Sequence, residues 1–319
     1  MKRLFAIIAG DPISINTEII AKIWKNSSSN QKKYIIIGSY KIFEHQLKKN
    51  KIKVKLNNLD SNLKNLDFKK LNILNIPTKL NLKKVDKNLI KNYIRNSVNL
   101  ANKLSKNKII SGFINCPIDK RNLGFKLTGL TEYLASINKI NGKEVMFLYG
   151  DKFSVSPITT HIPLNKVNQS ITKDKIINKI KTINLYYKKF FKIKPAIVVL
   201  GLNPHNNEFS KLSKETKVIL PAVNHLKKIG INLDGPFPAD TILLNKKKFN
   251  IIVGMYHDQV LPIFKAIHGF NAVNITFGLN YLRMSPDHGT AAKLIYKNKG
   301  NTSSLKKCIN LFNSINAKI

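Results

Sequence analysis

Short apolar runs alternate along the chain with amphipathic stretches of helical spacing, a pattern typical of α/β proteins. The apolar runs are rich in β-branched residues and are often followed by Gly, Pro, Asn or Asp, so they predict strands. The expected strands cover residues 4–9, 34–37, 109–114, 145–149, 154–159, 196–200 and 251–256. Repeated alternation of strands with helices predicts a largely parallel sheet whose two faces are covered.

Between these runs, apolar residues recur every three or four positions, which predicts helices. The expected helices cover residues 17–24, 42–49, 89–104, 131–139, 172–191 and 214–228. Residues 51–84 are rich in Asn and Lys and show little periodicity, so only short strands are expected there.

One stretch, residues 256–291, concentrates side chains that can do chemistry between short apolar runs. We expect loops at a sheet edge to carry them. A histidine beside an aspartate can bind a divalent metal, and a lysine and an arginine further on can hold an anionic substrate. The residues concerned are His257, Asp258, Lys265, Asn274, Arg283, Asp287, His288 and Gly289.

Three histidines, His161, His205 and His257, each follow an apolar run, where a strand of an α/β sheet presents ligands at its carboxyl end. Each one alone suits a structural role. Three in equivalent positions favour a metal site, in which Asp258 or Asp240 can orient a ring. By contrast, His45 and His225 lie in Lys-rich helical segments and are expected at the surface.

Composition limits the class of protein. With 319 residues and 43% hydrophobic content, the chain can bury a large core. Its two cysteines exclude a disulfide framework and fit a reducing compartment. The first apolar run is too short for a signal peptide and no run approaches the length of a membrane span, so we expect a cytoplasmic protein.

The formal net charge of +38 would suit a nucleic-acid partner. However, the basic residues are lysines scattered among many Asn and Ile residues, which indicates A/T-biased coding instead of a binding patch. Arginine occurs only at Arg3, Arg95, Arg121 and Arg283. We therefore expect no nucleic-acid partner, and note that a positive field would steer a phosphorylated, carboxylated metabolite toward the protein.

Five motifs occur in one order: GDP at 10–12, THIPL at 160–164, GLNPH at 201–205, GPFPADT at 235–241, and the stretch 256–291. With them the chain resembles the 4-hydroxythreonine-4-phosphate dehydrogenase family over nearly its whole length. The resemblance implies an isocitrate/isopropylmalate dehydrogenase-like α/β fold, with two α/β/α domains and a cleft between them. Residues 1–118 and 262–319 would form the first domain, on the cofactor side. Residues 119–261 would form the second domain, which carries the metal site and the dimer contact.

The resemblance also implies a reaction. The enzyme would oxidise 4-phosphooxy-L-threonine with NAD or NADP to 2-amino-3-oxo-4-phosphooxybutanoate, which decarboxylates to 3-amino-2-oxopropyl phosphate, in the biosynthesis of pyridoxal 5′-phosphate. It would need a divalent metal (Zn, Mg or Co). It would work as a homodimer with an active site shared between subunits.

Matched positions carry the family's roles onto this chain. Metal ligands would be His161, His205 and His257. Substrate contacts would be Thr131, Lys265, Asn274 and Arg283. Catalytic groups would be Lys265, Asp258 and Asp240, with Lys120 a weaker candidate. Cofactor contacts would be Asp287, His288, Gly289 and Thr290, where glycine permits close approach and a helix N-terminus follows. The loop 235–241 would be rigid and would present Asp240.

The chain departs from the family pattern in places. Leu130, in Gly129-Leu130-Thr131-Glu132, replaces a histidine that would touch the substrate, and leucine cannot donate a hydrogen bond. The segment 13–18 lacks the usual Gly and Pro, and Lys293 reverses a charge near the cofactor loop.

These departures leave alternatives open. One is a sister dehydrogenase acting on a phosphorylated threonate- or erythronate-like hydroxy acid. Others are a non-catalytic protein that binds a phosphorylated metabolite and an RNA-associated basic protein. Retention of the three histidines favours an enzyme.

Overall fold

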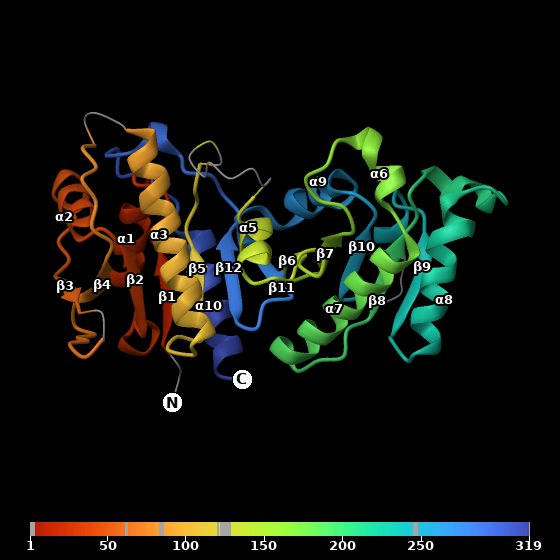
Figure 1. Ribbon diagram of the computed structural model, residues 1–319, viewed down its shortest axis with the longest axis horizontal. Helices are drawn as coiled ribbons and strands as arrows, with labels where there is room; N and C mark the ends of the chain where they lie inside the picture. The colour runs from red at the N-terminus through yellow and green to blue at the C-terminus, as the bar shows by residue number, and fades with distance from the viewer. Residues whose placement is uncertain are drawn as a thin grey trace. The chain divides into compact units, whose positions relative to one another are not determined.

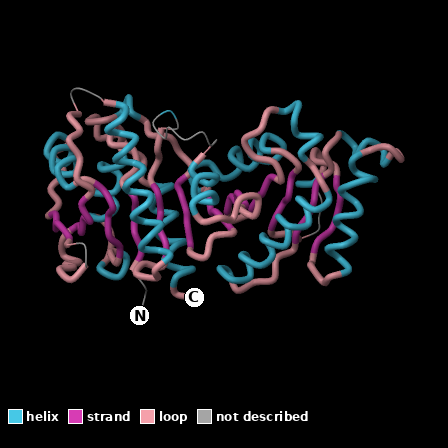
Figure 2. Tube along the Cα trace, viewed as in Figure 1, coloured by secondary structure: helices cyan, strands magenta, loops and turns pink. Residues whose placement is uncertain are grey.

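The computed structural model divides the chain into two compact units. Unit 1 comprises Met1–Leu134 and Asn280–Ala317, and unit 2 comprises Ala135–Leu279 and Lys318–Ile319. Figure 2 shows that each unit has strands in its interior and helices outside them. Residues described by the structure are 4–60, 63–82, 86–119, 121, 129–244 and 248–318, without the side chain of Asn30.

The sheet of unit 1 has the strand order β3-β4-β2-β1-β5-β12, and its neighbouring strands pair in parallel. Crossover helices are therefore required on its faces. In Figure 1, α3 crosses in front of this sheet and α10 lies behind it. The strands are β1 (Phe5–Ile8), β2 (Tyr34–Gly38), β3 (Leu56–Leu59), β4 (Leu71–Asn75), β5 (Gly112–Asn115) and β12 (Leu282–Pro286). The helices are α1 (Asn16–Lys25), α2 (Tyr40–Lys49), α3 (Lys87–Lys106) and α10 (Ser303–Asn316).

Aromatic side chains join strands to helices in the core of unit 1. Phe5 of β1 stacks on Phe312 of α10 with ring centroids 4.4 Å apart, and it also contacts Tyr34 of β2. All three side chains are buried. Burial of each such ring contributes about 1.5–3 kcal/mol, which fixes α10 against the strands.

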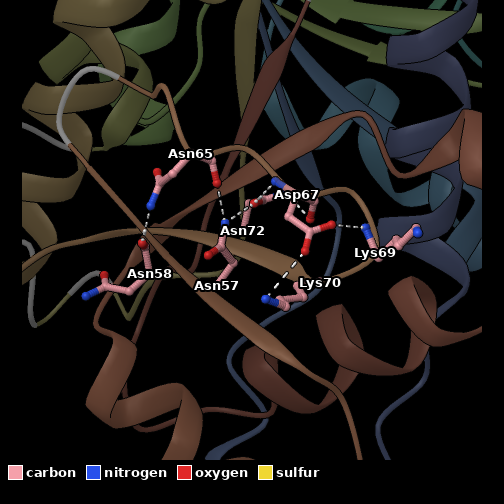
Figure 3. Close-up of polar contacts among 7 residues, drawn as sticks. All are labelled: Asn57, Asn58, Asn65, Asp67, Lys69, Lys70 and Asn72. Carbon is pink, nitrogen blue, oxygen red and sulfur yellow. Dashed lines mark hydrogen bonds and ion pairs between the residues drawn. The ribbon is translucent and has the colours of Figure 1, made fainter.

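The Asn-rich segment around β3 and β4 is ordered by side-chain amides (Figure 3). Asn57 donates to the Asn65 carbonyl at 2.7 Å and to Asn72 Oδ1 at 2.8 Å, and Asn72 in turn donates to the Asp67 carbonyl at 3.0 Å. The backbone N–H of Lys69 donates to the Asp67 carboxylate, which lowers the pKa of Asp67. These bonds depend on particular side-chain geometry, so hydrophobic periodicity gave no sign of them.

The sheet of unit 2 has the order β11-β6-β7-β10-β8-β9. The strands β7, β10, β8 and β9 run parallel, whereas β6 is antiparallel to both β11 and β7. The strands are β6 (Val145–Tyr149), β7 (Ser154–Pro157), β8 (Ile197–Leu200), β9 (Leu233–Phe237), β10 (Ile251–Gly254) and β11 (Val273–Phe277). The helices are α6 (Leu164–Ser170), α7 (Lys173–Phe191), α8 (Leu220–Lys228) and α9 (His257–His268), and α5 (Leu130–Ile137) crosses the unit boundary. No helix in the described part of the chain is long and apolar enough to cross a membrane.

The unit boundaries differ from the expected 118/119 and 261/262. They fall at 134/135 and 279/280. The physical reason is strand pairing: β11 pairs with β6 along its whole length, and α9 packs on β7 and β10. Lys265 and Asn274 therefore belong to unit 2, with the histidines.

Several local predictions were wrong. The side chains expected on loops after 256 lie partly on regular structure, because α9 begins at His257 and continues through Pro262. The expected rigid loop 235–241 begins as part of the edge strand β9, where proline is tolerated because no outer strand needs its N–H. The expected helix 214–228 is confirmed, except that its first turn, Glu215–Ile219, is π-helical and α8 follows it directly.

Candidate functional site

Three parallel neighbouring strands of unit 2 lead to the three candidate histidines. His161 follows β7, His205 follows β8 and His257 follows β10, and β10 pairs with both of the other strands. The carboxyl ends of parallel strands lie at one edge of a sheet, so these segments emerge at the same edge. The sequence prediction that each histidine comes after a strand is confirmed.

His161 and His257 form a close pair. Their ring centroids are 5.8 Å apart, and Asp258 Oδ1 lies 2.5 Å from His257 Nδ1. A carboxylate on Nδ1 fixes the tautomer with its proton on that nitrogen, which leaves Nε2 as the lone-pair donor. The pair is therefore suited to a divalent cation, whose ligand nitrogens lie about 2.0–2.1 Å from the metal.

His205 lies on an irregular loop. Residues 205–208 all have positive φ, between 47° and 58°. The ring is exposed, with Nδ1 3.6 Å from Glu208 Oε1 and Nε2 3.9 Å from Asp240 Oδ2. A run of left-handed residues costs backbone energy, so the surrounding structure must hold this loop in place.

Two side chains that the sequence did not single out hold the start of that loop. The carboxylate of the fully buried Glu215 accepts the N–H groups of Leu202 and Asn203, each at 2.8 Å. Gln259 of α9 donates to the Gly201 carbonyl at 2.7 Å and accepts from the Met255 N–H at 2.7 Å. The His205 loop is thus tied to the helix that begins with His257.

A cavity of about 400 Å³ lies beside these groups. Asp240 and Asp258 both line it, with Tyr256 and apolar side chains of β7, β8 and β10. It brings together the two carboxylates that contact His205 and His257. Within the described residues of one chain, however, no group of three or more His, Cys, Asp or Glu side chains is close enough to hold a metal ion.

Lys265 and Asn274 also belong to unit 2. Lys265 is exposed on α9, seven residues after Asp258, so the two lie on one face of the helix. Asn274 lies on β11, and its buried Oδ1 accepts no hydrogen bond from any described residue. A buried unpaired oxygen of this kind suits a ligand hydroxyl or ammonium.

Unit 1 contains a candidate anion-binding site around Arg283, a residue that is 3% exposed. Its Nε donates to Asn115 Oδ1 at 2.8 Å and its Nη1 to Thr131 Oγ1 at 3.4 Å. Burial lowers the pKa of Arg283 to about 10, so the guanidinium keeps its charge at neutral pH. Arg283 and Thr131, both predicted to contact substrate, are therefore in contact. Asn115, which orients the guanidinium, was missed because nothing but its place at the end of β5 marks it.

The predicted cofactor residues form one loop of unit 1. The N–H of Ile15 donates to the Thr290 carbonyl, and the N–H of Asp287 donates to Ser304 Oγ. His288 Nδ1 lies 2.9 Å from the Gly289 carbonyl, so Nδ1 carries the proton and Nε2 is an acceptor.

This loop fits a nucleotide in two respects. His288 Nε2 is buried and has no partner among the described residues. A Cβ added to Gly289 would meet nothing within 4 Å, so a ligand can approach its backbone. The expected helix N-terminus does not follow directly, because only a 3₁₀ turn, Ala292–Leu294, precedes α10. Lys120, the weaker candidate, lies outside the described residues.

Comparisons with known proteins agree with this arrangement. A family model described as "Pyridoxal phosphate biosynthetic protein PdxA" matches residues 30–312. The 4-hydroxythreonine-4-phosphate dehydrogenase of Sulfurihydrogenibium sp. (strain YO3AOP1) is 38% identical over 323 residues, covering 96% of each chain. That of Aquifex aeolicus (strain VF5) is 34% identical over the full length of both chains.

Solved structures are similar as well. The crystal structure of 4-hydroxythreonine-4-phosphate dehydrogenase from Klebsiella pneumoniae has a TM-score of 0.86 at 26% identity, covering 98% of this chain and 99% of that one. A terephthalate 1,2-cis-dihydrodiol dehydrogenase from Burkholderia xenovorans LB400 has a TM-score of 0.68 at 17% identity, which shows a shared fold alone. These likenesses confirm the expected α/β fold.

Proposed function

Because the chain belongs to the PdxA family of pyridoxal phosphate biosynthetic proteins and is a 4-hydroxythreonine-4-phosphate dehydrogenase-like oxidoreductase, we propose that it oxidises 4-phosphooxy-L-threonine at its 3-hydroxyl. Electrons leave as a hydride to NAD or NADP and the hydroxyl proton goes to a base. The product, 2-amino-3-oxo-4-phosphooxybutanoate, is a β-keto acid, which loses carbon dioxide to give 3-amino-2-oxopropyl phosphate.

The observation that carries the proposal is the His161–His257 pair with Asp258 on His257 Nδ1. The pair supplies two imidazole nitrogens, and His205 emerges at the same sheet edge. A divalent cation (Zn, Mg or Co) held there would acidify a coordinated alcohol. The chain's own contribution is to fix the rings and to keep Asp240 and Asp258 beside them.

Other side chains would bind and deprotonate the substrate. Arg283, oriented by Asn115 beside Thr131, provides a buried guanidinium whose planar donors match a carboxylate or phosphate. Asn274 Oδ1 would accept from a substrate donor, because it lacks a described partner. Lys265, Asp258 and Asp240 are the candidate proton acceptors, and the loop Asp287-His288-Gly289-Thr290 would receive the adenosine half of the cofactor.

Exposed apolar side chains support a homodimer whose subunits share the site. Leu164 and Leu212 line one cavity and Leu243 and Ile263 line another, yet all four are exposed. Tyr256, next to His257, lines both cavities. The described residues of one chain bring no third ligand close to the pair, so apolar surface around this site fits a second subunit that completes it.

The test is the appearance of NADH or NADPH absorbance at 340 nm with 4-phosphooxy-L-threonine, with and without added divalent metal. We expect metal-dependent turnover that chelation abolishes and that His257→Asn eliminates. Absence of turnover in the metal-loaded protein with either cofactor would reject the proposal.

The presence of Leu130 favours a second candidate function, that of a sister dehydrogenase acting on a phosphorylated threonate- or erythronate-like hydroxy acid. An apolar side chain replaces a hydrogen-bond donor beside Thr131, so the optimal substrate could present fewer acceptors there. The same assay with those acids distinguishes the two candidates by kcat/KM.

A further inference from the structure

A cavity of about 510 Å³ lies beside the amino-terminal end of α2 in unit 1, and we call it the α2 pocket. Ser39, Lys41 and His45 give it polar and basic groups, while Ile42, Leu80 and Leu82 give it an apolar wall. The other described lining residues, Thr78 and Asn81, are uncharged, so the described lining contains no carboxylate. Such a lining suits a ligand with an anionic group and an apolar body.

The first turn of α2 has hydrogen-bond donors that the described part of the chain leaves without acceptors. Ser39, the N-cap residue, is 2% exposed, and its hydroxyl makes no capping bond and no other hydrogen bond with described residues. The N–H of Tyr40 is taken by Asn75 Oδ1, whereas the N–H groups of Lys41 and Ile42 have no acceptor among the described residues. A hydroxyl on a residue that is almost fully buried, with two amides that have no described acceptor, supplies at this helix N-terminus the kind of donors that bind phosphate.

The charged side chain at this turn is positive, like the partial charge at the amino-terminal end of a helix. Lys41 carries an ammonium on the first turn of a ten-residue helix, and His45 lies one turn further on the same face. The partial positive charge of a helix N-terminus adds to that of Lys41, so an anion bound here is favoured twice.

The α2 pocket contacts the segment that follows the cofactor loop in the chain. The ring of His45, which lines the pocket, meets Tyr296 edge-on at 6.4 Å, and Tyr296 belongs to the segment that follows Thr290. That segment is held on α1 by the Gly300 N–H, which donates to Glu18 Oε1 at 2.7 Å. Between Thr290 and Gly300 the sequence has no Asp or Glu and contains Lys293, Lys297 and Lys299.

We infer that the α2 pocket binds the 2′-phosphate of a phosphorylated adenosine, so that the protein prefers NADP to NAD. The inference rests on the proposed function, which assigns the adenosine half of the cofactor to the neighbouring loop. In dinucleotide sites a carboxylate binds the free ribose 2′-hydroxyl of NAD, and a basic side chain accommodates the 2′-phosphate of NADP. The described lining of the α2 pocket offers only the second chemistry.

The direct test is calorimetric titration of the protein with adenosine 2′,5′-bisphosphate and with 5′-AMP at fixed ionic strength. We expect the bisphosphate to bind about tenfold tighter or more, since charge-assisted hydrogen bonds contribute on the order of one to two decades of affinity. Lys41→Ala and Ser39→Ala should each remove about tenfold of bisphosphate affinity and leave 5′-AMP binding unchanged.

Lys48→Ala is the matched control, because Lys48 is exposed on the last turn of the same helix and its loss changes the net charge equally. Equal affinity for the two nucleotides, or an equal loss in Lys48→Ala, would overturn the inference. Binding needs no turnover, so an inactive dehydrogenase that still prefers the bisphosphate would count against the proposed function alone. An active enzyme without that preference would overturn this inference alone.

Discussion

Leu130 lies where the sequence resemblance led us to expect a histidine, and its surroundings show what this difference would change. It begins α5, it is 9% exposed, and its neighbour Thr131 accepts a hydrogen bond from Arg283. Leu130→His would place a hydrogen-bond donor beside this group. We expect KM for 4-phosphooxy-L-threonine to fall about tenfold with little change in kcat, because a charge-assisted hydrogen bond contributes about 1.5–3 kcal/mol.

Steady-state kinetics on the wild type, Leu130→His and Leu130→Met test this. The methionine variant changes the side chain without adding a donor, so its KM should stay near that of the wild type. An unchanged or raised KM in Leu130→His would mean that the pocket is built around leucine, and it would favour the sister-dehydrogenase candidate.

Asp258 offers a second prediction at the scale of single residues. Its contact with His257 Nδ1 orients a proposed metal ligand, and removal of such a partner typically lowers metal affinity 10–100-fold. We expect Asp258→Asn to weaken Co²⁺ or Zn²⁺ binding by about that factor in a competition titration. Asp174→Asn, in the first turn of α7, is the control. Equal metal affinity in the wild type and Asp258→Asn would mean that Asp258 does not support metal binding.

At the scale of elements, strands were easier to predict than the segments around the site. The runs at β1, β2 and β8 are buried on both faces, so their hydrophobicity is continuous and they are recognisable as strands. The helix α9 was missed because Pro262 and five polar residues break its apolar pattern. Its amphipathic face becomes visible only when β7 and β10 are known to lie beneath it.

In the candidate site, too, some residues could be predicted from the sequence and others could not. The histidines after strands could be predicted, because histidine is recognisable in the sequence as a metal-binding residue type. The supports could not, because Glu215, Gln259 and Asn115 act through hydrogen bonds to backbone or to one partner far along the chain. Nothing in the residue type of a lone Glu in a Lys-rich helix marks it as a loop anchor.

Glu215 leads to a prediction about the His205 loop. Glu215→Gln keeps the shape of the side chain but replaces a charged acceptor of the Leu202 and Asn203 N–H groups with an amide. We expect the free energy of unfolding to fall by about 1.5–3 kcal/mol, which denaturant titration measures. Metal affinity should also fall, since the His205 loop loses its anchor.

Two further variants separate positioning from general stability. Glu208→Gln changes an exposed carboxylate on the same loop and should leave the unfolding free energy unchanged. Glu215→Asp keeps the charge and should recover part of the metal affinity. If Glu215→Gln lost stability but bound metal as tightly as the wild type, the His205 loop would not depend on this anchor.

For the whole molecule, the proposed dimer can be tested at one side chain. Leu212 is 80% exposed and lines the cavity that Tyr256 also lines. An exposed leucine can become aspartate at little cost to a monomer, whereas a charge buried in an apolar interface is strongly unfavourable. We expect Leu212→Asp to convert the dimer to a monomer in light scattering. Leu185→Asp, on an exposed position of α7, should remain dimeric.

The net charge of +38 gives the last prediction, because charge alone would suit a nucleic-acid-binding protein. Binding that neutralises many phosphates releases counterions and weakens steeply with salt. Here the lysines are spread over helices and loops of both units, as in the last turns of α1, α2, α3 and α7. A dispersed charge cannot follow the phosphates of one groove, so we expect weak binding that is lost at physiological salt.

Fluorescence anisotropy with labelled duplex DNA and single-stranded RNA, across a salt series, decides this. We expect dissociation constants well above the micromolar range at about 0.15 M salt. The positive electrostatic field of the protein should accelerate its encounter with a phosphorylated substrate. Because salt screens this field, kcat/KM should fall as ionic strength rises while kcat changes little. Sub-micromolar binding to either nucleic acid at physiological salt would instead assign the charge a second, nucleic-acid role beside the dehydrogenase site.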